Sequence, residues 1–258
     1  MNFIDVNQTR IEIRQIPGSN TLAPLVFLHE GLGSVSMWQS RHMDWPQAVC
    51  QASGRSGWLY SRRGYGQSEA IADVRGQNRL TPDYMHKEAW EVLPELLSVC
   101  GISQPVLVGH SDGASIALLH AARHDVAGVV AIAPHLFVED ITLRSIEAAK
   151  AAFEQGDLRS RLARFHADVD CAFWQWNDVW LSERFRSFDI QQECLAIHAP
   201  LLAIQGIDDP YGSLQHIELL HTNGVVQREV LQNCGHSPHR EQAQISRQLI
   251  VDFLRELP

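Results

Sequence analysis

The feature that most constrains this chain is a tight junction between a strand and a helix. An apolar run, Pro105 to Val108, leads directly into Gly109-His110-Ser111-Asp112-Gly113, and a helical pattern follows from Ala114 to Ala122. A serine in such a turn has a strained backbone, and the glycines on either side avoid a collision across the turn. The hydroxyl then projects at the edge of a sheet, beside the free N–H groups of a helix start. We therefore predict that Ser111 is a nucleophile; the alternative is a loop that only turns a corner.

Apolar runs recur along the chain at the spacing of alternating strands and helices. Residues 11–16 alternate as an antiparallel strand does, and residues 25–28 are continuously apolar, as in a strand covered on both faces. Further strands are predicted at residues 58–60, 106–108, 129–132, 201–204 and 225–231. Helical periodicity covers residues 84–99 and the C-terminal segment, where Ser237 is the expected cap and Pro238 the first helical residue. This alternation predicts an α/β fold.

One segment departs from the alternation. Residues 135–196 show helical patterns without a convincing strand, and they include three of the seven tryptophans, within residues 173–180. We expect a helical lid over the active edge of the sheet. The core would then comprise residues 1–134 and 197–258.

Charge and composition limit the partners. The formal net charge is -9 and there is no basic run, which argues against nucleic acid or an anionic membrane. The N-terminal residues lack a signal-like apolar core and no apolar stretch reaches membrane-spanning length, so we expect a cytoplasmic protein. The five cysteines are far apart and form no C-x-x-C pair, which favours reduced thiols. Motifs for a dinucleotide or a metal are also lacking, so we expect the protein to act on a small molecule without a cofactor. We expect a monomer or a homodimer.

A serine nucleophile needs a base and an acid that orients the base. The strand at residues 225–231 leads into a loop with His236 and His239, and we favour His236 because His239 falls in the first turn of the closing helix. The strand at residues 201–204 leads to Asp208 and Asp209, either of which could accept the second imidazole N–H. The alternative for this acidic segment is a simple turn.

The loop after residues 25–28, His29-Glu30-Gly31-Leu32-Gly33-Ser34, is the candidate for an oxyanion hole. Its backbone N–H groups, with Gly31 as the candidate, would act together with the N–H of Asp112. An apolar, aromatic substrate pocket is expected nearby, although tryptophans at helical spacing ordinarily pack in a core, and most of these residues are expected in the lid core. The predicted pocket residues are Glu30, Leu32, Trp38, His135, Trp176 and Trp180.

These motifs, in this order, resemble those of the α/β-hydrolase superfamily over essentially the whole chain. The resemblance rests on Ser111, Asp209, His236, the His-Glu-Gly-Leu-Gly loop and the turn at residues 61–68. It implies a mostly parallel eight-stranded sheet with flanking helices and a helical cap inserted after the sixth strand. Its Gly-x-x-Asp acid matches residues 206–209 and selects Asp209.

The chain departs from that family at two positions. Glu30 stands where the family usually has glycine, and we expect its carboxylate to turn away from the hole and pair with Arg62 or Arg63. Asp112 stands where a small or apolar residue is common. Its side chain is expected either to orient a polar lid residue or to remain solvated at the helix start.

The favoured function is a serine hydrolase that cleaves a small carboxylic ester or thioester through an acyl-enzyme. The same triad would also serve a hydrolase that cleaves a carbon–carbon bond in a ring-fission product. A ligand-binding receptor on the same fold is the alternative outside catalysis.

Overall fold

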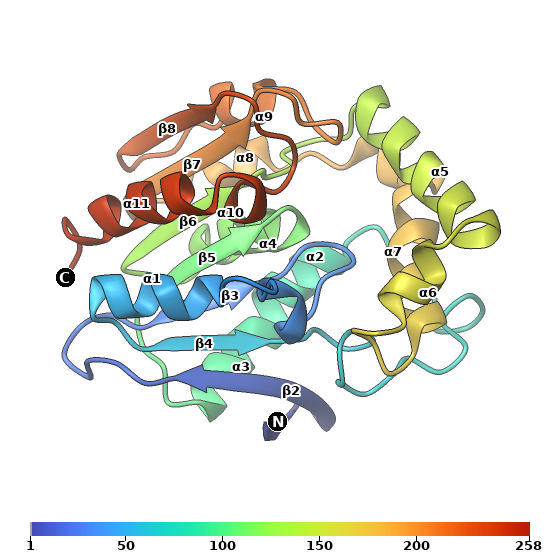
Figure 1. The fold of residues 1–258 in the computed structure, drawn as a ribbon, viewed down its shortest axis with the longest axis horizontal. Helices are drawn as coiled ribbons and strands as arrows, with labels where there is room; N and C mark the ends of the chain where they lie inside the picture. The colour runs from blue at the N-terminus through green and yellow to red at the C-terminus, as the bar shows by residue number, and fades with distance from the viewer. Residues whose placement is uncertain (1) are drawn as a thin grey trace.

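A computed structural model describes residues 2–258, and its centre is one eight-stranded sheet in the order β1-β2-β4-β3-β5-β6-β7-β8 (Figure 1). The strands are β1 (Asn2–Val6), β2 (Thr9–Ile16), β3 (Leu25–Leu28), β4 (Gly57–Tyr60), β5 (Val106–His110), β6 (Gly128–Ile132), β7 (Leu201–Gly206) and β8 (Val226–Leu231). β2 pairs antiparallel with β1 and β4, and every other pair is parallel. The predicted mostly parallel sheet is therefore confirmed, and β1 is a strand that the sequence analysis did not identify.

Alternation along the strands divides the core between the two faces of the sheet. In β3, Leu25 and Phe27 pack on one face, whereas Val26 and Leu28 pack on the other. The first face is covered by α1 (Trp45–Ser53), α10 (Pro238–Glu241), α11 (Ala243–Leu254) and the 3-10 turn η1 (Val35–Trp38). The second is covered by α2 (Tyr84–Lys87), the π-helical turn η2 (Glu88–Val92), α3 (Leu93–Val99), α4 (Asp112–Ala121), α8 (Gln191–Cys194) and α9 (Gln215–Glu218).

Two predicted helices differ in detail from the structure. The helix over residues 84–99 contains the π-helical turn η2, and the C-terminal helix breaks at Gln242, where φ is -128° and ψ is 48°. The predicted helix start is confirmed, with Ser237 at the N-cap position and Pro238 as the first residue of α10, but the Ser237 side chain makes no capping hydrogen bond. Instead, the Glu241 carboxylate accepts the backbone N–H groups of Gly235 and Ser237, at 2.7 and 2.9 Å.

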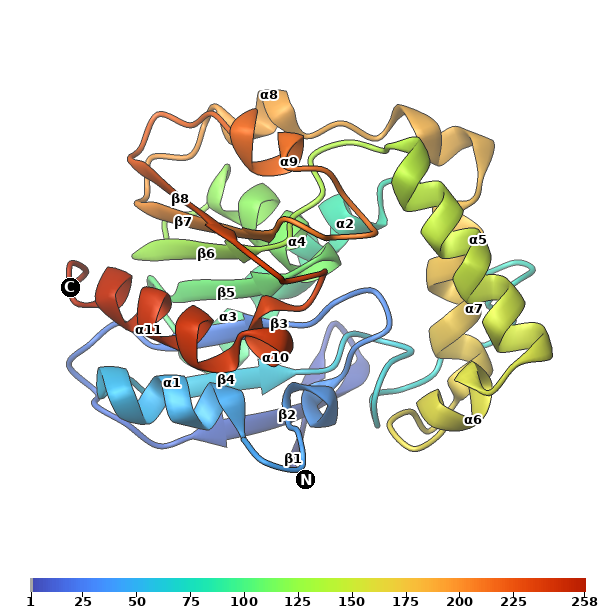
Figure 2. The same cartoon turned by 45° about the horizontal axis from the view of Figure 1, so that its top comes forward.

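The segment between β6 and β7 is helical, as its sequence indicated. It forms α5 (Asp140–Gln155), α6 (Leu158–Leu162), α7 (Val169–Trp180), the 3-10 turn η3 (Glu183–Ser187) and α8. The segment also contains an isolated antiparallel β-bridge, which joins Phe137 and Asp189. Figures 1 and 2 show α5, α6 and α7 beyond the carboxyl ends of the parallel strands. This position suits a lid, and that role stays a prediction.

All five thiols are free, and burial raises the pKa of Cys50 and of Cys194 to about 12. Within residues 2–258, no helix has the length and apolar character needed to cross a membrane.

Candidate active site

The strand–helix junction has the strained geometry that its sequence predicted. Ser111 lies between β5 and α4 with φ 54° and ψ -121°, a backbone conformation that L-residues rarely adopt. A Cβ on Gly109 would lie 2.3 Å from the carbonyl oxygen of Gly113, and a Cβ on Gly113 would lie 2.1 Å from that of Leu28. Both flanking positions therefore require glycine.

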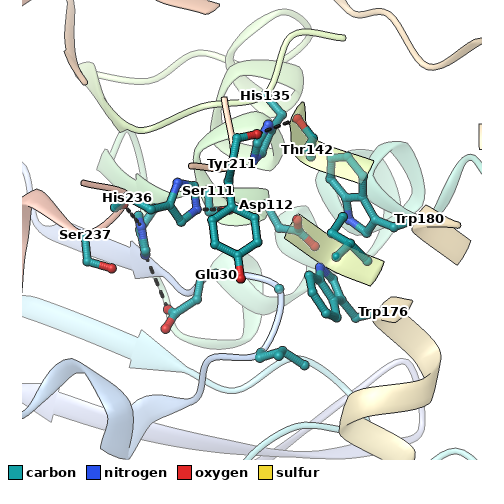
Figure 3. A pocket seen from close by; sticks show the side chains of 14 residues that line it. Glu30, Ser111, Asp112, His135, Thr142, Trp176, Trp180, Tyr211, His236 and Ser237 are labelled. Carbon is teal, nitrogen blue, oxygen red and sulfur yellow. Dashed lines mark hydrogen bonds and ion pairs between the residues drawn. The ribbon is translucent and has the colours of Figure 1, made fainter. Parts of the chain in front are cut away.

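Ser111, His236 and Asp209 form a continuous line of hydrogen bonds, and Figure 3 shows the part of it between Ser111 and His236. The Ser111 hydroxyl donates to Nε2 of His236 at 2.9 Å, and Nδ1 of His236 donates to Oδ2 of Asp209 at 2.8 Å. The Asp209 carboxylate also accepts the Gln205 side-chain amide at 2.7 Å and the backbone N–H of Tyr211 at 2.8 Å. Asp208, the neighbouring candidate, is exposed. This arrangement can transfer a proton from the serine and stabilise the imidazolium that results.

The loop that carries His236 is held from two sides. Nε2 of His110 donates to the His236 carbonyl oxygen at 2.8 Å, and Glu241 accepts the N–H groups on either side of His236. His239, the other histidine of this loop, is buried beneath Trp38 and Trp45, and burial holds its pKa well below the usual range. Of the two histidines, His236 is thus the one placed to act as a base.

The oxyanion-loop candidate is fixed through one carbonyl group. The Glu30 carbonyl oxygen accepts Nδ1–H of His29 at 2.7 Å, the N–H of Gly33 at 3.0 Å and Nη2–H of Arg62 at 3.0 Å. Since a trans peptide is planar, the N–H of Gly31 points the opposite way. Among residues 2–258 that N–H has no acceptor, and Gly31 lines the same cavity as Ser111 and Asp112. The N–H groups of Gly31 and Asp112 are therefore suited to receive a developing oxyanion.

The Glu30 side chain does not pair as we expected. Its Oε1 lies 3.1 Å from Nη2 of Arg240, and its Oε2 lies 3.5 Å from Nδ1 of His110. Arg62 contacts Glu30 through the backbone carbonyl oxygen and not through the carboxylate, and Arg63 pairs with Glu69 at 2.9 Å, so the predicted Arg62 or Arg63 partner is wrong. Burial opposes ionisation of Glu30, but the charge of Arg240 and the contact with His110 outweigh it and hold the pKa well below its usual range.

The Asp112 side chain is buried, so the expectation of a solvated carboxylate is wrong. Its Oδ2 accepts the Tyr84 hydroxyl at 2.6 Å and lies 3.7 Å from Nη2 of Arg62. The indole N–H of Trp180 donates to the same Tyr84 hydroxyl at 3.0 Å. Asp112 therefore orients a residue of α2, which in turn contacts α7 of the predicted lid. Burial raises the pKa of Asp112, although Arg62 and Tyr84 oppose that rise.

A cavity of about 200 Å³ opens above Ser111. Five of the six predicted pocket residues line it, namely Glu30, Leu32, His135, Trp176 and Trp180. The lining residues that the sequence analysis did not identify include His110, Thr142, Ile146, Tyr211 and Ser237. Trp38 is not among the lining residues, and its assignment to the pocket is wrong. Its ring stacks on that of Trp45, with the ring centroids 5.9 Å apart. Both rings lie in the core on the face of the sheet that α1 and α11 cover, because η1 packs against α1.

Comparison with known proteins agrees with this fold. A family model described as the alpha/beta hydrolase family matches residues 25–247, so the chain belongs to that family and is a hydrolase. A sequence search against curated proteins found no match.

Similar solved structures include an enol-lactonase from Burkholderia xenovorans LB400, with 21% identity, coverage of 98% of this chain and 100% of that one, and a TM-score of 0.71. A carboxylesterase structure from Nitrososphaera gargenis has 19% identity, 98% coverage of each chain and a TM-score of 0.72. Carboxylesterase CesB from Bacillus subtilis has 18% identity, coverage of 98% of this chain and 90% of that one, and a TM-score of 0.68. At these identities the likeness shows the shared fold.

Proposed function

We propose that this hydrolase uses Ser111 as its nucleophile and cleaves a small carboxylic ester or thioester through an acyl-enzyme. The observation that carries the proposal is the unbroken line from the Ser111 hydroxyl to His236 at 2.9 Å and on to Asp209 at 2.8 Å. The names of the structural neighbours, carboxylesterases and an enol-lactonase, support the same chemistry.

The reaction would proceed in two halves. His236 takes the Ser111 proton as Oγ attacks the ester carbonyl, and the N–H groups of Gly31 and Asp112 bind the resulting oxyanion. Collapse of the tetrahedral adduct breaks the bond to the alcohol or thiol, which takes the proton from His236. A water molecule, deprotonated by His236, then attacks the acyl-enzyme and releases the acid, and the proton returns to Ser111.

The cavity limits the size of the substrate. Drug-sized ligands occupy pockets of about 300–1,000 Å³, whereas this cavity measures about 200 Å³, and most of the surface that its lining residues expose is apolar. Helices α5 and α7 supply Thr142, Ile146, Trp176 and Trp180 to its wall. We therefore propose that residues 135–196 cover a compact acyl or alcohol group as a lid.

The test combines covalent labelling with turnover. We expect a fluorophosphonate to add once to the intact protein, as measured by mass, and p-nitrophenyl acetate and butyrate to be hydrolysed. Ser111→Ala should abolish the adduct and turnover, and Asp209→Asn should lower kcat by up to about 10⁴-fold. Asp208→Asn is the matched control, because that neighbouring carboxylate is exposed. A folded protein with neither adduct nor turnover would contradict the proposal and favour a binding role.

A further inference from the structure

Several polar side-chain groups on the wall of the Ser111 cavity have no hydrogen-bond partner in the protein, and two of them, on Trp176 and Tyr211, are donors that point into the cavity. Other donors of the wall are engaged: Trp180 donates its indole N–H to Tyr84 at 3.0 Å, and Thr142 donates to the carbonyl oxygen of Tyr211. The His135 ring and the Ser237 hydroxyl have no hydrogen-bond partner among residues 2–258. The indole N–H of Trp176 and the hydroxyl of Tyr211 have no hydrogen-bond partner among residues 2–258. Neither atom is sealed in the core as the indole N–H of Trp38 is.

Both donors lie beside the reacting groups. A Cβ on Gly31 would lie only 2.2 Å from Nε1 of Trp176, so this indole N–H is adjacent to a candidate oxyanion donor. The Tyr211 ring lies over His236 with the ring centroids 4.7 Å apart, and its backbone N–H is bound to Asp209 at 2.8 Å. Figure 3 shows the Tyr211 hydroxyl and the Trp176 nitrogen both pointing into the cavity.

The chemistry of these two groups defines what they can bind. An indole N–H only donates, so its partner must be an acceptor, and a phenol can donate to the same kind of atom. Buried tryptophan and tyrosine usually satisfy their polar atoms. An unbranched alkanoyl ester that filled this small cavity would enclose both donors without supplying an acceptor beyond the scissile ester group.

We propose that Trp176 and Tyr211 form a polar subsite, and that the substrate is an ester or thioester with a second acceptor oxygen, as ether, keto or hydroxyl, within a few bonds of the scissile carbonyl. This inference rests on the proposed serine-hydrolase function. A site that forms hydrogen bonds to its substrate discriminates strongly against an analogue that lacks the bonded atom. The subsite therefore sets specificity and leaves the chemical steps at Ser111 unchanged.

Matched esters test the subsite. On the acyl side, p-nitrophenyl methoxyacetate and p-nitrophenyl butyrate differ by one oxygen in place of one methylene. On the alcohol side, 2-methoxyethyl acetate and butyl acetate differ in a similar way. For each pair, the ratio of kcat/KM is divided by the ratio of the hydroxide rate constants, which removes the intrinsic reactivity of the esters.

Three variants separate hydrogen bonding from a change in cavity size. Trp176→Phe and Tyr211→Phe each remove one free donor. Trp180→Phe is the control, because Trp180 lines the same cavity one helical turn away and its N–H is already engaged. We expect the wild type to prefer the oxygen-containing ester by about tenfold or more in one pair. Trp176→Phe and Tyr211→Phe should lose most of that preference, and Trp180→Phe should keep it.

The subsite is refuted if the wild type shows no corrected preference in either pair, or if all three variants lose it equally. Should Trp176→Phe fail to fold, Tyr211→Phe decides alone, since it removes only a hydroxyl from a partly exposed ring. If the wild type showed neither fluorophosphonate labelling nor turnover of any ester, the proposed function itself would be contradicted. The two failures are therefore distinguishable.

Discussion

Replacing Arg62 by methionine removes a guanidinium that reaches both sides of the candidate oxyanion hole. Its Nη2 donates to the Glu30 carbonyl oxygen at 3.0 Å and lies 3.7 Å from Oδ2 of Asp112. The first contact fixes the peptide whose N–H belongs to Gly31, and the second holds the side chain of the other candidate donor. The variant therefore tests the geometry of the hole without altering a residue that would touch the substrate.

The expected loss of kcat in Arg62→Met depends on the hydrogen bonds that the Glu30 carbonyl group keeps. Loss of a whole oxyanion donor costs about 3 kcal/mol in the barrier. The Glu30 carbonyl keeps its hydrogen bonds from His29 and Gly33, so we expect about half of that cost, or roughly tenfold in kcat. KM should change little, because the hole acts on charge that develops in the transition state. Breaking a buried ion pair costs about 3–5 kcal/mol of folding stability. In Arg62→Met the Asp112 carboxylate still accepts the hydrogen bond from Tyr84, so we expect a loss at the lower end of that range.

The assay measures kcat and KM for p-nitrophenyl butyrate, the affinity for a boronic acid that forms a tetrahedral adduct with Ser111, and the free energy of unfolding. Arg63→Met is the matched control, because Arg63 is exposed and pairs only with Glu69. We expect kcat and boronate affinity to fall together in Arg62→Met and to stay unchanged in Arg63→Met. A folded Arg62→Met protein with wild-type kcat and boronate affinity would refute the reasoning.

Three further predictions concern single residues. Gly113→Ala places a Cβ 2.1 Å from the backbone oxygen of Leu28, so a thermal melt should show marked destabilisation; an unchanged Tm would contradict the packing argument. Glu30→Gln should retain ester turnover within about threefold, with an unchanged pH profile, because the carboxylate is engaged by Arg240 rather than by the reacting groups; a far larger loss would assign Glu30 to the chemistry. Hydrogen bonds from His216 and from Ser213 lower the pKa of Glu139 to about 2. The ionised Glu139 side chain therefore adds to the free energy of unfolding above the unfolded pKa of about 4.3, and this contribution is lost as the pH falls toward 2. Urea unfolding of Glu139→Gln should therefore show a deficit at pH 7 that shrinks through this window, and a deficit independent of pH would contradict the assignment.

Features set by neighbouring residues were predictable from the sequence. The strand–serine–helix junction and the buried strands β3, β5, β6 and β7 each depend on a short run of residues, and the structure places them within two residues of the predicted bounds. β1 was not predicted, because it has only five residues and most of them are exposed. The turn that joins β1 to β2 consists of Asn7 and Gln8, which both have positive φ. A two-residue turn of this kind is difficult to predict from the sequence when it contains no glycine.

Contacts between distant residues were not predictable in the same way. Glu30 finds Arg240 only because α10 returns to the oxyanion loop 210 positions later in the chain. Tyr211 is placed by Asp209 and Thr142, and nothing in its immediate sequence indicates that its ring lies over His236. Trp38 has the aromatic character of a pocket residue, but which face of the sheet it covers depends on the packing of η1 against α1.

The wall of the Ser111 cavity has two separate origins along the chain. Ser111, Tyr211 and His236 belong to the segments that follow β5, β7 and β8, whereas Thr142, Ile146, Trp176 and Trp180 belong to α5 and α7. Selection for a new substrate can therefore act on the helices while the sheet keeps the reacting atoms in register. Tyr84 is the exception, because it bonds both Asp112 and Trp180. Divergence at position 180 would thus carry an activity cost that divergence at position 146 would avoid.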